Sequence, residues 1–482
     1  MRMKDILSII QDNFYFAFML IVILAVFLGL GYFVVYKKLL KGSKSLSKRK
    51  VIIWLCLIGY IIMVIGVTFI NRGSRIYGDT NLHLFSSYRE AWNSFNSVTW
   101  RFIYLNIFML VPLGILLPLL NKRFQKLSWL VGAAVLMTLM IETTQLVTGY
   151  GIFDLDDIFN NVLGAIIGYG IVMPILTILE NKKGKFKRSV IYLTPLILVV
   201  VSTLAIIALY HAQEFGNLSI AHNYKINMKN IDLISNVDLE VDGKEVFLAN
   251  EKYSIKKVPI YRAPIYDVTS GEAFFADFLK HKNIDPEIEV DPYSDMAIYW
   301  SRGEPSYSMW FDYHGGSYQY SDFSFFDVGI ERAQTDEANL RKILADFAIA
   351  IPDEAIFSVA DDGITEGTYE WLIENKVDGE SITNGKLTVD YYNDDSVKQI
   401  DNQIITYQKV NDVSIKSQEE AYQELADGKF NLNWPKDVRT IKIEDVTLAY
   451  MLDTKGFYQP IYNFSSKVNG ADTMISIPAI PR

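Results

Sequence analysis

The stretch FIYLNIFMLVPLGILLPLL, residues 102–120, contains no charged side chain. A helix needs about 20 predominantly apolar residues to cross the hydrocarbon core of a bilayer. Five other runs of similar length and composition lie before and after this stretch. The six runs are Phe14–Tyr36, Val51–Ile70, Phe102–Leu120, Leu127–Val147, Ile158–Leu179 and Val190–Tyr210. Because the buried helices of a soluble protein rarely reach this length so many times in succession, the sequence predicts a polytopic α-helical membrane bundle.

The charges of the loops predict how the bundle is oriented, since Lys and Arg are enriched in cytoplasmic loops. Basic side chains gather in alternate loops, after the first, third and fifth runs. They are Lys37, Lys38, Lys41, Lys44, Lys48, Arg49, Lys50, Lys122, Arg123, Lys126, Lys182, Lys183, Lys185, Lys187 and Arg188. We therefore expect loops 71–101 and 148–157, and everything after Tyr210, on the extracellular side. The run Phe14–Tyr36 is too long for a signal peptide and is interpreted as a retained helix.

The chain of 482 residues divides into two parts of opposite charge. Residues 1–189 carry a net charge of +12 and residues 190–482 a net charge of −21. This asymmetry predicts two environments, and the acidic part makes a nucleic-acid partner improbable. The expected domains are an N-terminal span with its basic loop (1–50), a four-helix membrane domain (51–180), a basic loop with the sixth span (181–210) and an extracytoplasmic domain (211–482).

Cysteine usage limits the chemistry of the extracytoplasmic domain. The single cysteine, Cys56, lies in an apolar run. The domain therefore has no disulfide framework and no structural Cys-zinc site. A cysteine-free exterior domain is compatible with the surface of a Gram-positive bacterium.

Strongly polar side chains interrupt three of the spans. Asn106 lies in the third run, Glu142 and Gln145 in the fourth, and Asn160 and Asn161 in the fifth. With a rise of about 1.5 Å per residue, Asn106, Glu142 and Asn161 all lie roughly 5–8 Å below the outer boundary. Polar groups in a membrane need a partner or a function. We therefore expect a polar pocket near the outer leaflet.

Small residues and acidic residues accompany these polar groups. Gly164 and Gly168 form a G-x-x-x-G pattern, which lets a neighbouring helix approach closely. Pro112 and Gly114 can bend the third span. The polar groups can alternatively serve only to hold the bundle together, and Asp156 or Asp157 can simply cap the start of the fifth span. The acidic group Asp154, Asp156 and Asp157 is a weak candidate for binding a divalent cation.

Several motifs in this region resemble the VanZ-like family of bacterial membrane proteins, over residues 51–179. The segment from Asn106 to Gly114 is similar to the N-x-x-x-F-x-P-L-G pattern of that family, with Leu110 in place of the phenylalanine. Glu142-Thr-Thr-Gln145 is similar to its E-x-x-Q pattern. The stretch DLDDIFNNVLGAIIG (residues 154–168) is similar to its D-x-D-D-x-x-x-N-x-x-G-x-x-x-G pattern.

One position departs from that family pattern. Many members carry an arginine just before the acidic stretch, where this chain has Gly151. Arg72, Arg75 or Arg101 in the outer loops could take its place beside the carboxylates, or they could only extend to the interface. The hypothetical pocket comprises Asn106, Glu142, Gln145, Asp154, Asp157, Asn161, Arg72 and Arg101.

The resemblance implies a role in the cell envelope and, for some members, resistance to glycopeptides of the teicoplanin type. The expected partners are membrane lipids, lipid-linked wall precursors or glycopeptides. The family supplies no established reaction. Alternatively, the chain is a membrane enzyme that modifies envelope lipids or wall precursors, or a membrane-anchored regulatory sensor. No metal or cofactor is expected, and catalytic residues are not identified.

Residues 211–482 show the patterning of a soluble α+β domain with mainly antiparallel sheet. Strands are expected at Asp238–Leu248, Met296–Trp300, Ser306–Tyr313, Leu387–Tyr392, Ile404–Val410, Arg439–Leu452 and Tyr458–Ser465. Helices are expected at Gly271–His281, Thr335–Ala350 and Ser417–Ala426. Ser417 and Glu420 form a capping box for the last helix, and Gly428 follows it as a stop.

The exterior domain shows no catalytic motif. Its histidines are scattered, and it has neither H-E-x-x-H nor G-x-S-x-G. Residues 412–482 resemble a helix-plus-sheet module found in the accessory protein YycI and in PepSY-like domains, which implies binding of a wall component or a partner protein. Aromatic residues are abundant, and they favour sheet packing over a stacking surface for sugars or peptides. They are Tyr307, Trp310, Phe311, Tyr313, Tyr318 and Tyr320.

Overall fold

The structure is a computed structural model in which two compact units can be described separately. It describes residues 47–70, 80–95, 97–179, 185–220, 226–235, 257–282, 284, 287–293, 295–360, 366–430 and 438–481. The membrane unit comprises Met1–Trp92 and Asn96–Gln213, and the sheet unit comprises Glu214–Arg482 with Asn93–Phe95. The first expected span, Phe14–Tyr36, lies outside the described residues.

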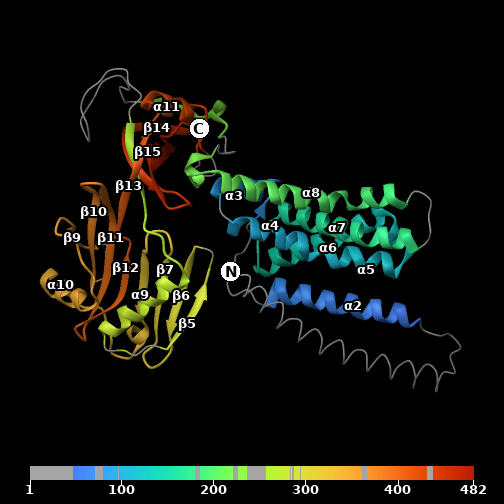
Figure 1. The fold of residues 1–482 in the computed structure, drawn as a ribbon, viewed down its shortest axis with the longest axis horizontal. Helices are drawn as coiled ribbons and strands as arrows, with labels where there is room; N and C mark the ends of the chain where they lie inside the picture. The colour runs from blue at the N-terminus through green and yellow to red at the C-terminus, as the bar shows by residue number, and fades with distance from the viewer. Residues whose placement is uncertain are drawn as a thin grey trace. The chain divides into compact units, whose positions relative to one another are not determined.

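The membrane unit is built mainly from helices (Figure 1). Five spans in the described residues are long and apolar enough to cross a membrane: Lys48–Phe69, Thr99–Leu120, Leu127–Thr148, Leu155–Leu179 and Phe186–Ala212. They confirm the five predicted runs that fall on described residues. The elements are α2 (Lys48–Ile65), η2 (Gly66–Ile70), β1 (Thr80–Asn81), α3 (Ser86–Ser94), α4 (Ser97–Met109), α5 (Val111–Leu120), η3 (Lys122–Gln125), α6 (Leu127–Thr148), β2 (Phe153–Asp154), α7 (Leu155–Leu179) and α8 (Lys185–Ala212).

The third predicted run is two helices rather than one. Leu110 leaves the helical conformation, with φ −97° and ψ 6°, and separates α4 from α5. Pro112 follows in the first turn of α5, where its missing N–H costs least. The Tyr60 hydroxyl donates to the carbonyl oxygen of Met109 over 2.8 Å, immediately before the break. A side chain of α2 thus satisfies a backbone group at the interruption.

The sheet unit contains one large sheet with helices packed against it (Figure 1). Its helical elements are η4 (Asn217–Ser219), η5 (Met228–Asn230), α9 (Val268–His281), η6 (Phe323–Phe326), α10 (Glu337–Asp346) and α11 (Gln418–Ala426). Its strands are β3 (Asp232–Ser235), β4 (Lys257–Arg262), β5 (Ile288–Pro292), β6 (Met296–Ser301), β7 (Tyr307–Asp312), β8 (Tyr318–Asp322), β9 (Ile356–Val359), β10 (Thr368–Asp378), β11 (Ser381–Tyr392), β12 (Ser396–Asn402), β13 (Ile405–Ser414), β14 (Thr440–Leu452), β15 (Phe457–Val468) and β16 (Ala471–Pro478).

The main path of the sheet runs β3-β14-β15-β4-β13-β11-β12-β8-β7-β6-β5. Strand β10 pairs with β11 and β9, and β16 pairs with β15. The described pairings of the sheet are antiparallel apart from the parallel pair β3–β14. The predicted α+β class with mainly antiparallel sheet is therefore confirmed.

The two largest hydrophobic cores of the sheet unit each pack helices against this sheet. The larger packs α9 and α10 against strands β6, β7, β8, β10, β11 and β12, with Trp371, Tyr299 and Tyr320 fully buried. The second packs α11 against β14, β15 and β16, and it also takes side chains from β3 and β4. The region 412–482 therefore shares its core with strands from earlier in the chain.

Most strands and helices predicted from patterning are present in the sheet unit. The capping box is formed as expected: Glu420 N–H donates to Ser417 Oγ over 3.1 Å, and Ser417 N–H donates to Glu420 Oε2 over 2.8 Å. Gly428 follows with φ +74°, a conformation that favours glycine. The strand expected at Asp238–Leu248 lies outside the described residues.

The abundant aromatic residues are mostly used in packing. Five of the six that stand out in the sequence are buried: Tyr307, Phe311, Tyr313, Tyr318 and Tyr320. Trp310 differs from them, because 47% of its surface is exposed.

Candidate functional site

Helix α7 is the central helix of the membrane unit. It packs against α4, α5, α6 and α8, and 61% of its apolar window is buried, compared with none of the window of α8. Polar side chains on α7 therefore face other helices rather than lipid. Three of them, Asp156, Asn160 and Asn161, are almost completely buried.

Glycines bring the backbone of α7 into direct contact with α4 and α5. A Cβ atom on Gly164 would lie 1.8 Å from the carbonyl oxygen of Ile107, and one on Gly168 would lie 2.1 Å from that of Val111. From the opposite side, a Cβ atom on Gly114 would lie 2.1 Å from the oxygen of Ala165. No larger residue fits at these contacts, so the glycines determine how closely the helices approach.

This close approach joins polar groups from three helices. Asn106 on α4 donates its amide hydrogen to the carboxylate of Asp157 on α7. Asn161 on α7 donates to Thr138 Oγ1 on α6 over 2.9 Å. Glu142, also on α6, accepts a hydrogen bond from the backbone N–H of Asp154 over 3.2 Å. We call the side chains of seven residues the polar core: Asn106, Thr138, Glu142, Gln145, Asp157, Asn160 and Asn161.

Most of the polar core is buried, whereas Asn106 and Asp157 are half-buried. Only 1% of the surface of Glu142 and 4% of that of Gln145 is exposed, and Asn161 is fully buried. A buried carboxylate or amide is costly unless it has hydrogen-bond partners. The contacts between α4, α6 and α7 are therefore strongly constrained.

Asp154 and Asp156 have structural partners. Asp154 is the residue before α7, and its Oδ1 accepts from Asp156 N–H over 2.7 Å, as in a helix cap. Its Oδ2 accepts from the amide of Asn81 over 3.0 Å. Asp156 and Asp157, the alternative capping residues, lie in the first turn of α7, where the helix dipole favours an anion, but neither precedes the helix, which begins at Leu155.

Asp156 instead holds the start of α3. Its carboxylate accepts from the backbone N–H groups of Phe85 and Ser87, the latter over 2.7 Å, and from Ser86 Oγ over 3.2 Å. An anion at the amino end of a helix is favoured by the helix dipole. Within the described ranges, no group of three or more His, Cys, Asp or Glu side chains is arranged to hold a metal ion.

Sequence reasoning missed residues that complete the polar core. Asn81 lies on β1, which pairs in parallel with β2 so that Asn81 is opposite Asp154. The Tyr88 hydroxyl on α3 donates to Asn160 Oδ1. The only hint in the sequence was the polarity of the loop 71–101, which gives no partner for any single residue.

Two buried polar atoms on α7 lack a hydrogen-bond partner among the described residues. They are Asn160 Nδ2, a donor, and Asn161 Oδ1, an acceptor. Of the predicted cations, Arg101 is half-buried near the start of α4, and Arg72 and Arg75 lie outside the described residues. The expected pairing of Arg72 with a carboxylate therefore stays a prediction.

The fold and the polar core define the class of this protein: a multi-pass α-helical membrane protein with an appended α+β domain. Residues 51–179 match the family VanZ/LLP1. The membrane unit thus contains a VanZ/LLP1 domain, which confirms the resemblance seen in the motifs.

Comparison with solved structures finds the C-terminal domain of YpeB from Bacillus megaterium. The two share 12% sequence identity, with a TM-score of 0.21, over 45% of this chain and 95% of that one. No curated protein matches this chain.

Proposed function

We propose that the polar core binds the head group of a membrane lipid or of a lipid-linked wall precursor, and that this binding lowers susceptibility to teicoplanin-type glycopeptides. The observation that carries the proposal is the meeting of carboxylate and amide groups from α4, α6 and α7 at one level of the bundle. Intramembrane ionisable groups are costly, and a binding role explains why they are present.

The chemistry of the polar core favours a particular kind of head group. Glu142 and Asp157 present carboxylate oxygens, which accept hydrogen bonds. Asn160 Nδ2 and Asn161 Oδ1 add one donor and one acceptor that lack partners in the described structure. A head group rich in ammonium, hydroxyl or amide donors complements this set. Leaving a buried polar atom unpaired costs about 1–3 kcal/mol, which such a ligand recovers.

The same proposal includes the orientation of the chain in the membrane. The charges of the basic loops at 37–50, 122–126 and 182–188 support a cytoplasmic location for those segments. The polar core then opens towards the outer leaflet, and the sheet unit lies outside the cell. Wall precursors are carried on lipids at that surface, within reach of the polar core.

The test uses conservative substitutions in the polar core. Glu142→Gln and Asp157→Asn remove a carboxylate and keep the side-chain size, and each is expected to reduce the inhibitory concentration of teicoplanin at least fourfold, to the level of a strain lacking the protein. The matched control is Glu90→Gln, because Glu90 is an exposed carboxylate on α3. Membrane levels of each variant are measured by immunoblot.

Two further measurements separate the proposal from its alternatives. Lipids that copurify with the detergent-solubilised wild type, but not with Asp157→Asn, support head-group binding. Wild-type resistance in both polar-core variants contradicts it. A lipid composition that differs between wild type and Glu142→Gln cells indicates an enzyme, and loss of resistance on deleting residues 216–482 indicates a sensor.

A further inference from the structure

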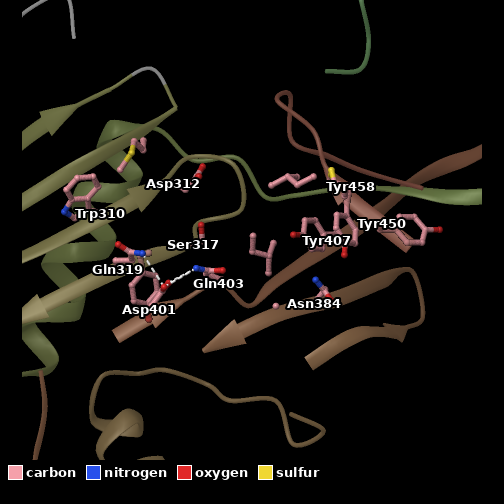
Figure 2. Close-up of a pocket in the computed structure, with 16 residues that line it drawn as sticks. Trp310, Asp312, Ser317, Gln319, Asn384, Asp401, Gln403, Tyr407, Tyr450 and Tyr458 are labelled. Atoms are coloured by element: carbon pink, nitrogen blue, oxygen red, sulfur yellow. Dashed lines mark hydrogen bonds between the residues drawn. The ribbon is translucent and has the colours of Figure 1, made fainter. Parts of the chain in front are cut away.

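A groove of about 530 Å³ lies in the sheet unit, and Figure 2 shows the residues that line it. Its lining residues come mainly from strands β6, β7, β8, β11, β12, β13, β14 and β15. Small-ligand sites have volumes of roughly 300–1,000 Å³, so the groove has room for a ligand of several rings. It belongs to the sheet unit alone and is independent of the polar core.

The floor of the groove is one face of the sheet. Trp310 on β7 pairs with Gln319 on β8, and Gln319 pairs with Asp401 on β12. Residues directly opposite each other in a sheet point to the same face. The alternate residues of these strands, such as Met309 and Tyr320, point to the other face and are buried beneath α9 and α10. The floor is therefore the face of these strands that lies opposite α9 and α10.

The floor carries an ordered set of hydrogen-bonding groups. Gln319 Nε2 donates to Asp401 Oδ2 over 3.3 Å, and Gln403 Nε2 donates to both carboxylate oxygens of Asp401 over 3.1 Å (Figure 2). These bonds orient both amides so that their oxygens remain as acceptors. Asn384 Oδ1 accepts from the backbone N–H of Asn375 over 3.1 Å, which leaves its Nδ2 as a donor beside the groove.

Three tyrosines form the opposite wall. The rings of Tyr407 and Tyr458 are stacked with centroids 4.0 Å apart, and those of Tyr450 and Tyr458 with centroids 5.3 Å apart. The hydroxyl of Tyr450 donates to Pro259 O, and that of Tyr458 donates to Asn375 Oδ1, each over 2.9 Å. The wall is therefore held in place before any ligand binds.

The composition of the groove excludes two classes of ligand. None of the described residues that line it is Lys, Arg or His, and two, Asp312 and Asp401, are acidic. An anionic ligand would be repelled. An extended peptide that binds by adding a strand needs a free edge. Strands β7, β8 and β12 are each paired on both sides, so the floor of the groove offers no such edge.

We infer that the groove binds an uncharged glycan chain. Aromatic side chains bury apolar surface on their ring faces. The exposed indole of Trp310 therefore offers an apolar face to the C–H groups of one sugar ring. The carboxylate of Asp401 and the amides of Gln319 and Gln403 accept hydrogen bonds from sugar hydroxyls, and Asn384 donates one. The three tyrosines close one side of the groove, so the glycan chain must lie along the floor.

The experiment titrates the full chain in lipid nanodiscs with tetra-N-acetylchitotetraose and with cellotetraose, by isothermal titration calorimetry. Saturable binding of at least one tetrasaccharide is expected for the wild type. Trp310→Ala is expected to weaken it at least tenfold, and Trp310→Phe, which keeps a ring, is expected to weaken it less. Phe326→Ala is the matched control, because Phe326 is a 75% exposed aromatic residue outside the groove lining.

The outcomes separate this inference from the function proposed for the polar core. Glu142→Gln should leave the affinity for the tetrasaccharide within twofold of wild type, because the two sites are in different units. Absence of binding to both tetrasaccharides by the wild type would overturn the inference. Equal weakening by Trp310→Ala and Phe326→Ala, or binding only of an extended alanine peptide, would overturn it too.

Discussion

Replacing Gly164 by alanine should force α7 away from α4. The added Cβ would lie 1.8 Å from the carbonyl oxygen of Ile107, whereas a carbon and a carbonyl oxygen approach only to about 3.3 Å. The two helices must therefore separate by roughly 1.5 Å. The obstruction is backbone, so a rotamer change cannot relieve it.

The destabilisation expected from Gly164→Ala has two contributions. Overpacking of a well-packed interface typically costs about 1–3 kcal/mol. The separation also lengthens the hydrogen bond from Asn106 to Asp157, and an interhelical bond in a membrane is worth about 0.6 kcal/mol. Gly164→Ala should therefore lower the free energy of unfolding of the membrane unit by roughly 2–4 kcal/mol.

Reversible unfolding in mixed micelles by increasing SDS, followed by tryptophan fluorescence, measures this loss. Gly132→Ala is the matched control, because Gly132 is an exposed glycine on α6 and its added Cβ would meet no atom within 4 Å. That control should be unchanged or more stable by about 0.5–1 kcal/mol, since alanine is the better helix former. If Gly164→Ala proved as stable as Gly132→Ala, close packing of α7 on α4 would be refuted.

Two further predictions concern the sheet unit. Burial raises the pKa of Asp312 in the folded state above its usual value. The folded state therefore binds this proton more tightly than the unfolded state does. The stability of the sheet unit should fall as the pH rises from the unfolded-state pKa to the folded-state pKa. Asp312→Asn should raise the melting temperature more at pH 7.5 than at pH 4.5, and an equal effect at both would contradict the reasoning. Ser417→Ala removes one half of the capping box and should cost about 1 kcal/mol in denaturant unfolding, whereas Ser414→Ala, at an exposed strand end, should cost less than half as much.

The spans of the membrane unit could be predicted from the sequence because the bilayer imposes one requirement on every backbone group. Each N–H and C=O must be satisfied within its own segment, so an apolar run of about 20 residues has few alternatives to a helix. The capping box at Ser417 was equally predictable, since its partners are three residues apart. Local rules of this kind also predicted most of the strands.

The partners of the polar residues could not be predicted in this way. The sequence shows three aspartates close together, yet only the packing decides that Asp154 accepts from Asn81 and that Asp156 holds the start of α3, which lies 70 residues earlier in the chain. Backbone groups of a distant loop compete for each carboxylate, and spacing along the chain does not reveal that competition.

The spans, their charge asymmetry and the polar motifs follow directly from the amino-acid sequence, because each depends on neighbouring residues. Which polar groups meet depends on the packing of helices and strands. Asn106 reaches Asp157 because Gly164 lets two backbones touch, and Trp310, Gln319 and Asp401 form one row because the register of three strands aligns them. Both arrangements depend on contacts between segments far apart in sequence. The free energy of such contacts cannot be predicted from a local sequence pattern.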